Sequence, residues 1–325
     1  MVEGSTVTQL VTFGETMLRL SPPKGERLET ADRFDAGIGG AESNVAVAAA
    51  QLGVDAVWLS KLPDSPLGRR VARELRGHGV RTGVTWDDSE ESRLGTYYLE
   101  YGGAPRGTNV LYDRADAAIT TVSPTELPLE AIQGASVFHT TGITPALSPA
   151  TAETTAALLE TAAEAGTTCS FDVNYRSKLW SPEAARETYE SLFEHVDVLF
   201  VPERDAARVF GYEGNAVEIA HGIGTDYDFE TVVLTRGEAG SLALHDGELH
   251  EQETLPADTV DAIGTGDAFV GGFLSRQIHG GDIDDCLAYG AGAAALKRTV
   301  SGDVAVLTHR ELVEVLGDER GDISR

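Results

Sequence analysis

The sequence has two cysteines, four lysines and no long apolar run. Cys169 and Cys286 lie far apart and in no metal-binding spacing, which favours two buried free thiols over a disulfide or a zinc site. No stretch approaches the roughly 20 apolar residues of a membrane-spanning helix. The first residues also lack the basic-then-apolar order of a signal peptide. These absences predict a soluble, cytoplasmic protein with no membrane partner.

Positive charge is scarce as well. The chain has 25 basic and 52 acidic residues, for a net charge of -27. Such a charge repels nucleic acid and anionic membranes, so neither is expected as a partner. An anionic ligand would need local attraction from backbone amides, a helix N-terminus, a metal ion or a few arginines. Because acidity with so little lysine resembles proteins of salt-accumulating microbes, we expect a halophilic source.

Short β-branched runs alternate with amphipathic helices along most of the chain. Strands are expected at 10–13, 56–60, 136–141, 168–172, 197–201 and 231–235, and helices at 43–52, 67–76, 267–278 and 284–298. Ser148 and Ser181, each followed by proline, begin two further helices, and Thr308 with Glu311 forms a capping box for a last one. The polar tail at 317–325 is expected to fray. This order predicts an α/β fold with a doubly wound, mainly parallel sheet flanked by helices.

Two segments, about 15–36 and 93–121, do not fit this alternation. Each carries strand-like residues with no helix between them, such as Met17, Leu18 and Leu20 in the first. We expect both segments to form a small β-sheet lid inserted in the core. Since the chain has no internal repeat and no low-complexity linker, a single domain over 1–325 is predicted.

The strongest local signal is DAIGTGDAFVGG at 261–272, which follows an extended stretch and opens an apolar helix. Gly264, Thr265 and Gly266 let the backbone turn so that successive N–H groups point at one spot. The helix dipole adds positive potential there, which makes an anion hole. Asp267, in the first helical turn, is placed to accept a proton from a hydroxyl group. For this string alone, a glycine-rich turn with an ordinary aspartate is the alternative.

Two other phosphate-binding loops are disfavoured. The GxGxxG pattern of a dinucleotide loop is missing, and the absence of GKS or GKT excludes a P-loop. A second glycine-rich segment lies at 37–53, where Gly39 and Gly40 precede Asn44 and an alanine-rich helix. The glycines allow a ligand to approach the backbone, and Asn44 can hydrogen-bond it. A tight turn into a packed helix would account for Gly53 and the alanines, but it accounts poorly for Gly37, Gly39, Gly40 and Asn44 together.

The two motifs, in this order and separation, resemble the two signatures of the PfkB carbohydrate kinase family. The resemblance spans nearly the whole chain. It implies a ribokinase-like fold, ATP and Mg²⁺, a lid that closes over the sugar, and a homo-oligomer formed through that lid; it leaves a K⁺ requirement open. Phosphoryl transfer in such enzymes is mostly positioning and charge stabilisation, which suits an anion hole and one base.

The resemblance also implies nucleotide and metal contacts. A TxGxxG-like turn follows the strand at 231–235. The implied nucleotide contacts are Asn174, Thr235, Gly237, Gly240, Gly264 and Gly266. Glu203 and Asp205 stand where the family has an NxxE-type motif that organises metal-bound water. Because Pro202 replaces its asparagine and Asp205 its glutamate, solvated carboxylates at a helix start are the equal alternative.

Three local features narrow the substrate. FDVNYRSKLW at 171–180 follows a strand into a loop, and YDR at 112–114 lies with Tyr97 in the expected lid. Arg114 and Arg176 suit a carboxylate, because the guanidinium fork matches that group, although a surface salt bridge is the alternative for each alone. With Ser301-Gly302-Asp303, these features resemble 2-keto-3-deoxygluconate kinases more than ribokinases or adenosine kinases. The implied sugar contacts are Gly39, Gly40, Asn44, Tyr97, Tyr112, Arg114, Arg176 and Asp303.

The expected reaction is ATP-dependent phosphorylation of 2-keto-3-deoxygluconate at O6, with Asp267 as the base. Its product would be 2-keto-3-deoxy-6-phosphogluconate, in an Entner–Doudoroff-type sugar degradation. The 4-epimer, 2-keto-3-deoxygalactonate, stays open because one stereocentre changes only a few hydrogen bonds. Fructokinase is the alternative enzyme. A non-catalytic sugar or nucleotide sensor is the alternative from another class, and Asp267 beside an intact glycine hole argues against it.

Overall fold

The computed structural model describes residues 8–317, so the tail expected to fray lies, from residue 318 onward, outside the described residues. Its main sheet has nine strands in the order β13-β12-β11-β10-β9-β8-β1-β4-β5. These strands are β1 (Leu10–Phe13), β4 (Ala56–Pro63), β5 (Arg81–Asp87), β8 (Val137–Thr141), β9 (Thr168–Asp172), β10 (Val198–Pro202), β11 (Thr231–Thr235), β12 (Ser241–His245) and β13 (Glu248–Gln252).

The strands from β11 to β5 run parallel, and the β12–β13 hairpin adds an antiparallel edge. β1 lies between β4 and β8, with Val11 opposite Val57 on one side and Phe138 on the other. The chain therefore builds the sheet outward from β1 in one direction and then, from β8, in the other. Such a switch opens a crevice at the carboxyl ends of the strands, where ligands bind in open α/β sheets. The predicted doubly wound α/β fold is confirmed.

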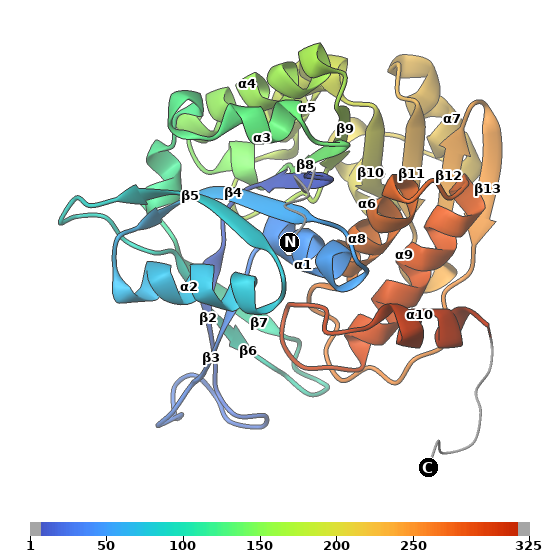
Figure 1. The fold of residues 1–325 in the computed structure, drawn as a ribbon. Helices are drawn as coiled ribbons and strands as arrows, with labels where there is room; N and C mark the ends of the chain where they lie inside the picture. Colours follow the sequence, from blue (N-terminus) through green and yellow to red (C-terminus); the bar gives the residue numbers. More distant parts are fainter. Residues whose placement is uncertain (1–7, 318–325) are drawn as a thin grey trace, which may run out of the picture.

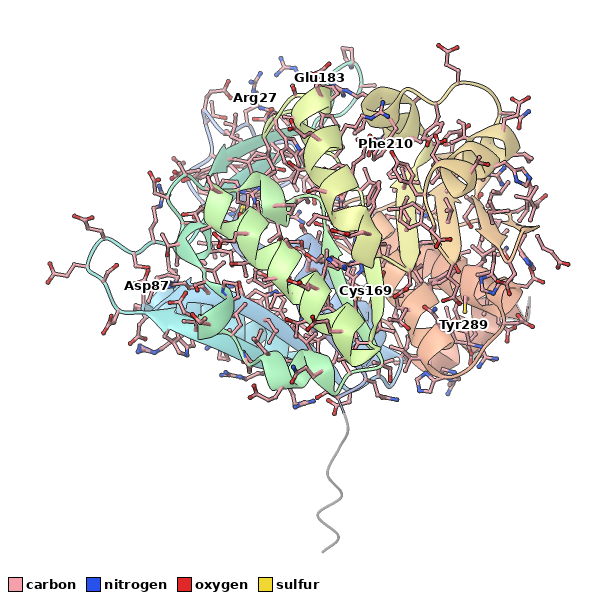
Figure 2. All side chains as sticks on the ribbon, turned by 90° about the horizontal axis from the view of Figure 1, so that it is seen from above. Arg27, Asp87, Cys169, Glu183, Phe210 and Tyr289 are labelled. Carbon is pink, nitrogen blue, oxygen red and sulfur yellow. The ribbon has the colours of Figure 1, made fainter. Side chains whose placement is uncertain are left out.

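Helices cover both faces of the sheet, as Figure 1 shows. One face is covered by α1 (Ala41–Gln51), α2 (Pro66–Gly77), α8 (Thr265–Ile278) and α9 (Ile283–Arg298), with α10 (His309–Leu316) packed on α9. The other face is covered by α3 (Leu129–Gln133), α4 (Pro149–Ala165), α5 (Pro182–Leu192) and α7 (Ala216–Asp226). Figure 2 views this second face, where Cys169 of β9 lies under α4 and its thiol faces the carbonyl oxygen of Leu159 at 3.6 Å.

Local signals set the helix ends where the sequence predicts them. The hydroxyl of Ser148 accepts a hydrogen bond from the backbone N–H of Thr151 at 3.1 Å, which caps α4. Gly166 ends the same helix in the left-handed conformation, with φ 74°. The capping box of Thr308 and Glu311 is present at the start of α10. Within residues 8–317, no helix is both long and apolar enough to span a membrane.

A smaller four-stranded sheet projects from the core below the main sheet in Figure 1. It has the order β3-β2-β6-β7, with β2 (Met17–Ser21), β3 (Asp35–Gly39), β6 (Thr96–Glu100) and β7 (Asn109–Asp113). A buried ion pair between Arg19 of β2 and Asp303, in the loop after α9, joins this small sheet to the core. The small sheet is therefore held over the carboxyl ends of the main strands.

Candidate active site

A cavity of about 1110 Å³ lies between the carboxyl ends of the main strands, the small sheet and the start of α8. It gathers side chains from segments that are distant in the sequence. The expected site residues along its wall are Gly39, Gly40, Asn44, Tyr97, Tyr112, Arg114, Asn174, Arg176, Glu203, Thr235, Gly237, Gly240, Gly264, Thr265, Gly266, Asp267 and Asp303. Asp205 is the one expected residue that does not line it.

The start of α8 forms a group of free backbone donors beside a carboxylate. Gly264 precedes the helix in the left-handed conformation, with φ 77°, and a Cβ there would collide with the backbone of Asp303. Within the described residues, the N–H groups of Gly264, Gly266 and Asp267 have no backbone acceptor, whereas that of Thr265 donates to the carbonyl oxygen of Ala262 at 3.4 Å. Donors of this kind at a helix N-terminus bind anions. Thr265 thus stabilises the turn, and its neighbours keep their N–H groups available.

Asn44 holds the carboxylate of Asp267. Its side-chain amide donates a hydrogen bond to Asp267 Oδ2 at 2.6 Å, and this bond joins the start of α1 to the first turn of α8. Burial raises the pKa of Asp267 to about 6, against the opposing influence of this hydrogen bond and of Arg176. At neutral pH the group is therefore mainly ionised but close to its pKa, which suits a general base.

Two further carboxyl groups line the cavity near Asp267, and the sequence did not single them out. Glu42 accepts hydrogen bonds from the hydroxyls of Thr141 and Thr144, both at 2.7 Å, and burial raises its pKa to about 7. Burial and the charge of Asp267 raise the pKa of Asp172 to about 8. The region around the base therefore disfavours additional negative charge. Of the three carboxyl groups, Asp267 has the lowest pKa and is the first to ionise as pH rises.

The lid side of the cavity is built on Asp303. The hydroxyl of Tyr97 donates to Asp303 Oδ2 at 2.6 Å, and Arg19 pairs with the other carboxylate oxygen. A Cβ at Gly39 would collide with both Tyr97 and Asp303, so only glycine allows this close approach. These contacts bring the first glycine motif, the small sheet and the loop after α9 to one point of the cavity wall.

The two expected arginines have different partners. Arg176 donates to the carbonyl oxygens of Asn174 and Tyr175 at 3.1 and 3.2 Å, so no carboxylate neutralises it by contact within the described range 8–317. Arg114 instead forms an ion pair with Glu15, and among the described residues its Nε lacks a partner. Burial raises the pKa of Glu15, against the attraction of Arg114. Both guanidinium groups line the cavity and retain donors for an anionic ligand.

The TxGxxG-like turn joins β11 to β12 at the far end of the cavity. Gly237 and Gly240 have φ 60° and 85°, and a Cβ at Gly240 would collide with the backbone of Gln252. Arg236 stabilises the turn by donating to the carbonyl oxygen of Ser241 at 3.2 Å. The glycines therefore place bare backbone, rather than side chains, along this wall.

The described residues suit indirect binding of Mg²⁺, through water, and not a site made of protein ligands alone. Glu203 lines the cavity, whereas Asp205 is buried behind it, 3.6 Å from Arg204, with its Oδ2 unpartnered in the part of the chain that is described. Residues 8–317 contain no group of three or more His, Cys, Asp or Glu side chains that would hold a metal ion by themselves. Mg²⁺ commonly keeps several waters and binds through one or two carboxylates and the substrate's phosphates. The donors present suit that mode of binding.

An α/β core with an anion-binding helix start, a held carboxylate and a covering β-sheet defines a small-molecule phosphotransferase of the ribokinase-like fold. Comparison with protein families matches residues 7–310 to the pfkB family carbohydrate kinases. The chain belongs to this family, and it is an ATP-dependent sugar kinase.

Individual relatives agree with this assignment. The chain is 60% identical over 317 residues to the 2-dehydro-3-deoxygalactonokinase of Haloferax volcanii, covering 98% of this chain and 99% of that one. It is 31% identical to the probable fructokinase-3 of Arabidopsis thaliana, covering 83% and 77%. The crystal structure of 2-dehydro-3-deoxygluconokinase from Thermotoga maritima superposes with a TM-score of 0.88 at 35% identity, covering 95% and 98%.

Proposed function

We propose that this kinase phosphorylates a 2-keto-3-deoxy sugar acid (also called a 2-dehydro-3-deoxy sugar acid) on its terminal O6 hydroxyl. The observation that carries the proposal is the placement of Arg114 and Arg176 on the same cavity as Asp267 and the free amides of α8. A sugar acid has a carboxylate at one end and a primary hydroxyl at the other. The cavity offers cationic forks for the first and a base for the second.

Asp267 is the base in the reaction that we propose. Its carboxylate takes the proton of the O6 hydroxyl as that oxygen attacks the γ-phosphorus of ATP. The bond from the γ-phosphorus to the β,γ-bridging oxygen breaks, and ADP leaves with that oxygen. The N–H groups of Gly264 and Gly266 stabilise the charge on the transferred group. Glu203 would help to hold Mg²⁺ that enters with ATP, and the ion would supply charge neutralisation at the phosphates.

We infer that the 4-epimer, 2-keto-3-deoxygalactonate, is the preferred substrate. The sequence motifs alone favour the gluconate epimer. The relative that is 60% identical over nearly the full length is named for the galactonate acid, however, and the structure named for the gluconate acid is 35% identical. The product is then 2-keto-3-deoxy-6-phosphogalactonate, in a branch of Entner–Doudoroff-type sugar degradation.

A coupled assay of ADP release tests this proposal. The purified protein is given Mg²⁺-ATP in high KCl with each of the two keto acids and with fructose. We expect kcat/KM to be highest for the galactonate acid, lower for its epimer and lowest for fructose. Equal or better turnover of fructose would overturn the sugar-acid proposal and favour a fructokinase. Better turnover of the gluconate acid would overturn only the choice of epimer.

We further propose that two copies of the protein meet through the small sheet. Leu111 of β7 is 49% exposed and Phe34, beside β3, is 39% exposed, so the sheet presents apolar side chains away from the core. A Leu111→Lys variant should shift the molar mass measured by light scattering from dimer to monomer. A wild-type protein that is monomeric at all concentrations would contradict this assignment.

A further inference from the structure

Lys297 is a buried charged group that the proposed chemistry does not use. It lies in the last turn of α9, and its side chain has no exposed surface. Lysine is almost never buried without a partner, because desolvating an ammonium costs far more than the burial of its stem gains. We therefore expect the ammonium group of Lys297 to make an interaction that offsets the cost of its desolvation.

The ammonium group of Lys297 contacts backbone carbonyl oxygens, which can only accept hydrogen bonds. Lys297 Nζ contacts the carbonyl oxygens of Asp261 and Val300, both at 3.4 Å. In residues 8–317 no carboxylate oxygen lies within salt-bridge distance of it, although the charges of Asp261 and Asp303 act on it through space. Burial lowers the pKa of Lys297; the charges of Asp261 and Asp303 oppose that effect, and the repulsion of Arg19 adds to it. Backbone carbonyls with nearby carboxylates are a ligand set typical of a bound monovalent cation.

The two carbonyls belong to the two loops that form the reactive end of the cavity. Asp261 begins the turn that carries Gly264 and the free amides of α8, and Val300 begins the loop that carries Asp303. The backbone N–H of Gly302 also donates to Asp261 Oδ2 at 3.0 Å, which joins the same two loops from the other side. Because Gly264 is in contact with the backbone of Asp303, any separation of these loops moves the anion hole.

We propose that the ammonium of Lys297 is a built-in monovalent cation that ties the turn before α8 to the loop after α9, so that phosphoryl transfer needs no added K⁺. Lys297 is a positioning residue, since among the described residues it is not one of those that line the cavity. It also places positive charge behind the anion hole of a chain whose net charge is -27. The proposal rests on phosphoryl transfer at this site, and not on which sugar acid is used.

The test compares K⁺ with a cation too large to enter the site. Wild type, Lys297→Ala and Lys297→Met are assayed with the best sugar substrate in KCl and in choline chloride of equal ionic strength. We expect the wild type to be equally active in both salts. Lys297→Ala should lose about 10- to 100-fold in kcat in choline chloride and recover in KCl, where K⁺ occupies the vacated space. Lys297→Met fills that space without charge and should stay slow in both.

A matched control and a second readout make the result decisive. Lys61→Ala removes a lysine that contacts a carbonyl oxygen at 3.3 Å and a carboxylate at 3.1 Å far from the cavity, so it should show no dependence on the cation. Thermal unfolding needs no sugar. The gain in melting temperature from choline to K⁺ should be larger for Lys297→Ala than for wild type or Lys61→Ala.

Four outcomes would overturn the proposal. They are a wild type that needs K⁺ for activity, a Lys297→Met variant with wild-type kcat, a Lys297→Ala variant whose melting temperature and rate ignore K⁺, and a Lys297→Ala variant that fails to fold in KCl. If no sugar acid is turned over, the melting temperatures still decide the question.

Discussion

The side-chain amide of Asn44 lies 2.6 Å from the carboxylate of Asp267, although 223 positions separate them in the chain. Each residue belongs to one of the two glycine-rich motifs. The hydrogen bond therefore makes a single unit of two signals that the sequence shows separately. It also means that the ionisation of the base depends on a residue from another helix.

Asn44→Ala should change the pH profile. The hydrogen bond stabilises the charged form of Asp267 and lowers its pKa, so its loss raises that pKa. Activity rises with pH as the base ionises. The midpoint of the acidic limb of kcat/KM should therefore move upward, from about pH 6 to about pH 7. Asn215→Ala, which removes the cap of α7 remote from the cavity, is the control and should leave the midpoint in place. An unchanged midpoint in Asn44→Ala would disprove the coupling.

Asp267→Asn should remove most turnover and leave the fold intact. An amide cannot accept the proton of the sugar hydroxyl, and loss of a general base costs about 10²- to 10⁴-fold in rate. The amide is similar in size, so the melting temperature and the affinity for ATP should stay close to wild type. Rates come from ADP release and affinity from calorimetry. Retained turnover would show that another group is the base.

Gly264→Ala should damage catalysis more than an equivalent change elsewhere. Gly264 and Gly166 both adopt left-handed φ, 77° and 74°, so alanine costs about 1 kcal/mol of backbone strain at either site. Only at Gly264 would the new Cβ collide with Asp303, whereas space around Gly166 is open within the described structure. We expect a small loss in melting temperature for Gly166→Ala, and for Gly264→Ala a larger loss together with a fall of about 10²-fold in kcat. Equal activity of both variants would mean that the turn before α8 tolerates displacement.

Arg176→Ala should weaken the use of a sugar acid far more than that of a neutral sugar. A hydrogen bond to a charged group contributes about 1.5–3 kcal/mol, or about 10- to 100-fold in kcat/KM. Arg310→Ala, which removes an exposed arginine on α10, is the control. The measurement is the ratio of kcat/KM for the keto acid to that for fructose. Similar losses for both substrates would show that Arg176 supports its own loop instead of the substrate.

Asp172→Asn should stabilise the protein in a pH-dependent way. Because the folded pKa of Asp172 is about 8, above its ordinary 3.8, folding favours the protonated form. Its contribution to stability is full below about pH 4 and is lost as pH rises through about 8. Asparagine stays neutral and can keep the hydrogen bond that Asp172 Oδ1 accepts from the N–H of Asn174. The gain in melting temperature should therefore grow from about pH 5 to about pH 9. A constant difference would contradict the raised pKa.

Much of the fold follows from local signals. The buried strand at Thr168–Asp172 has the ends that the sequence predicts, and the proline-started helices α4 and α5 begin where it predicts, because β-branched runs and caps act over a few residues. Strand β5 has no such signal, since it is an edge strand with Gly83 in its middle and is only half-buried. The β12–β13 hairpin was not predicted either. Its Asp246-Gly247 turn, with φ 50° and 79°, is a hairpin signal that the sequence does contain.

The candidate site also has some residues that the sequence reveals and others that it does not. Glycines and Asp267 are visible as motifs, because backbone conformation and helix starts are local. The roles of Glu42 and Lys297 depend on burial and on contacts with Thr141, Asp261 and Val300, which only the assembled fold brings near. Asp172 could be suspected from its place at the carboxyl end of a strand, but its raised pKa comes from neighbours in three dimensions.

The burial of both thiols has a consequence for the sensitivity of this protein to oxidation. Cys169 and Cys286 are enclosed in the core, and burial raises the pKa of each to about 12. The thiolate is the form that oxidants and other sulfurs attack, and here it is scarce as well as shielded. Folded molecules thus cannot become cross-linked to one another through sulfur, and purification needs no reductant.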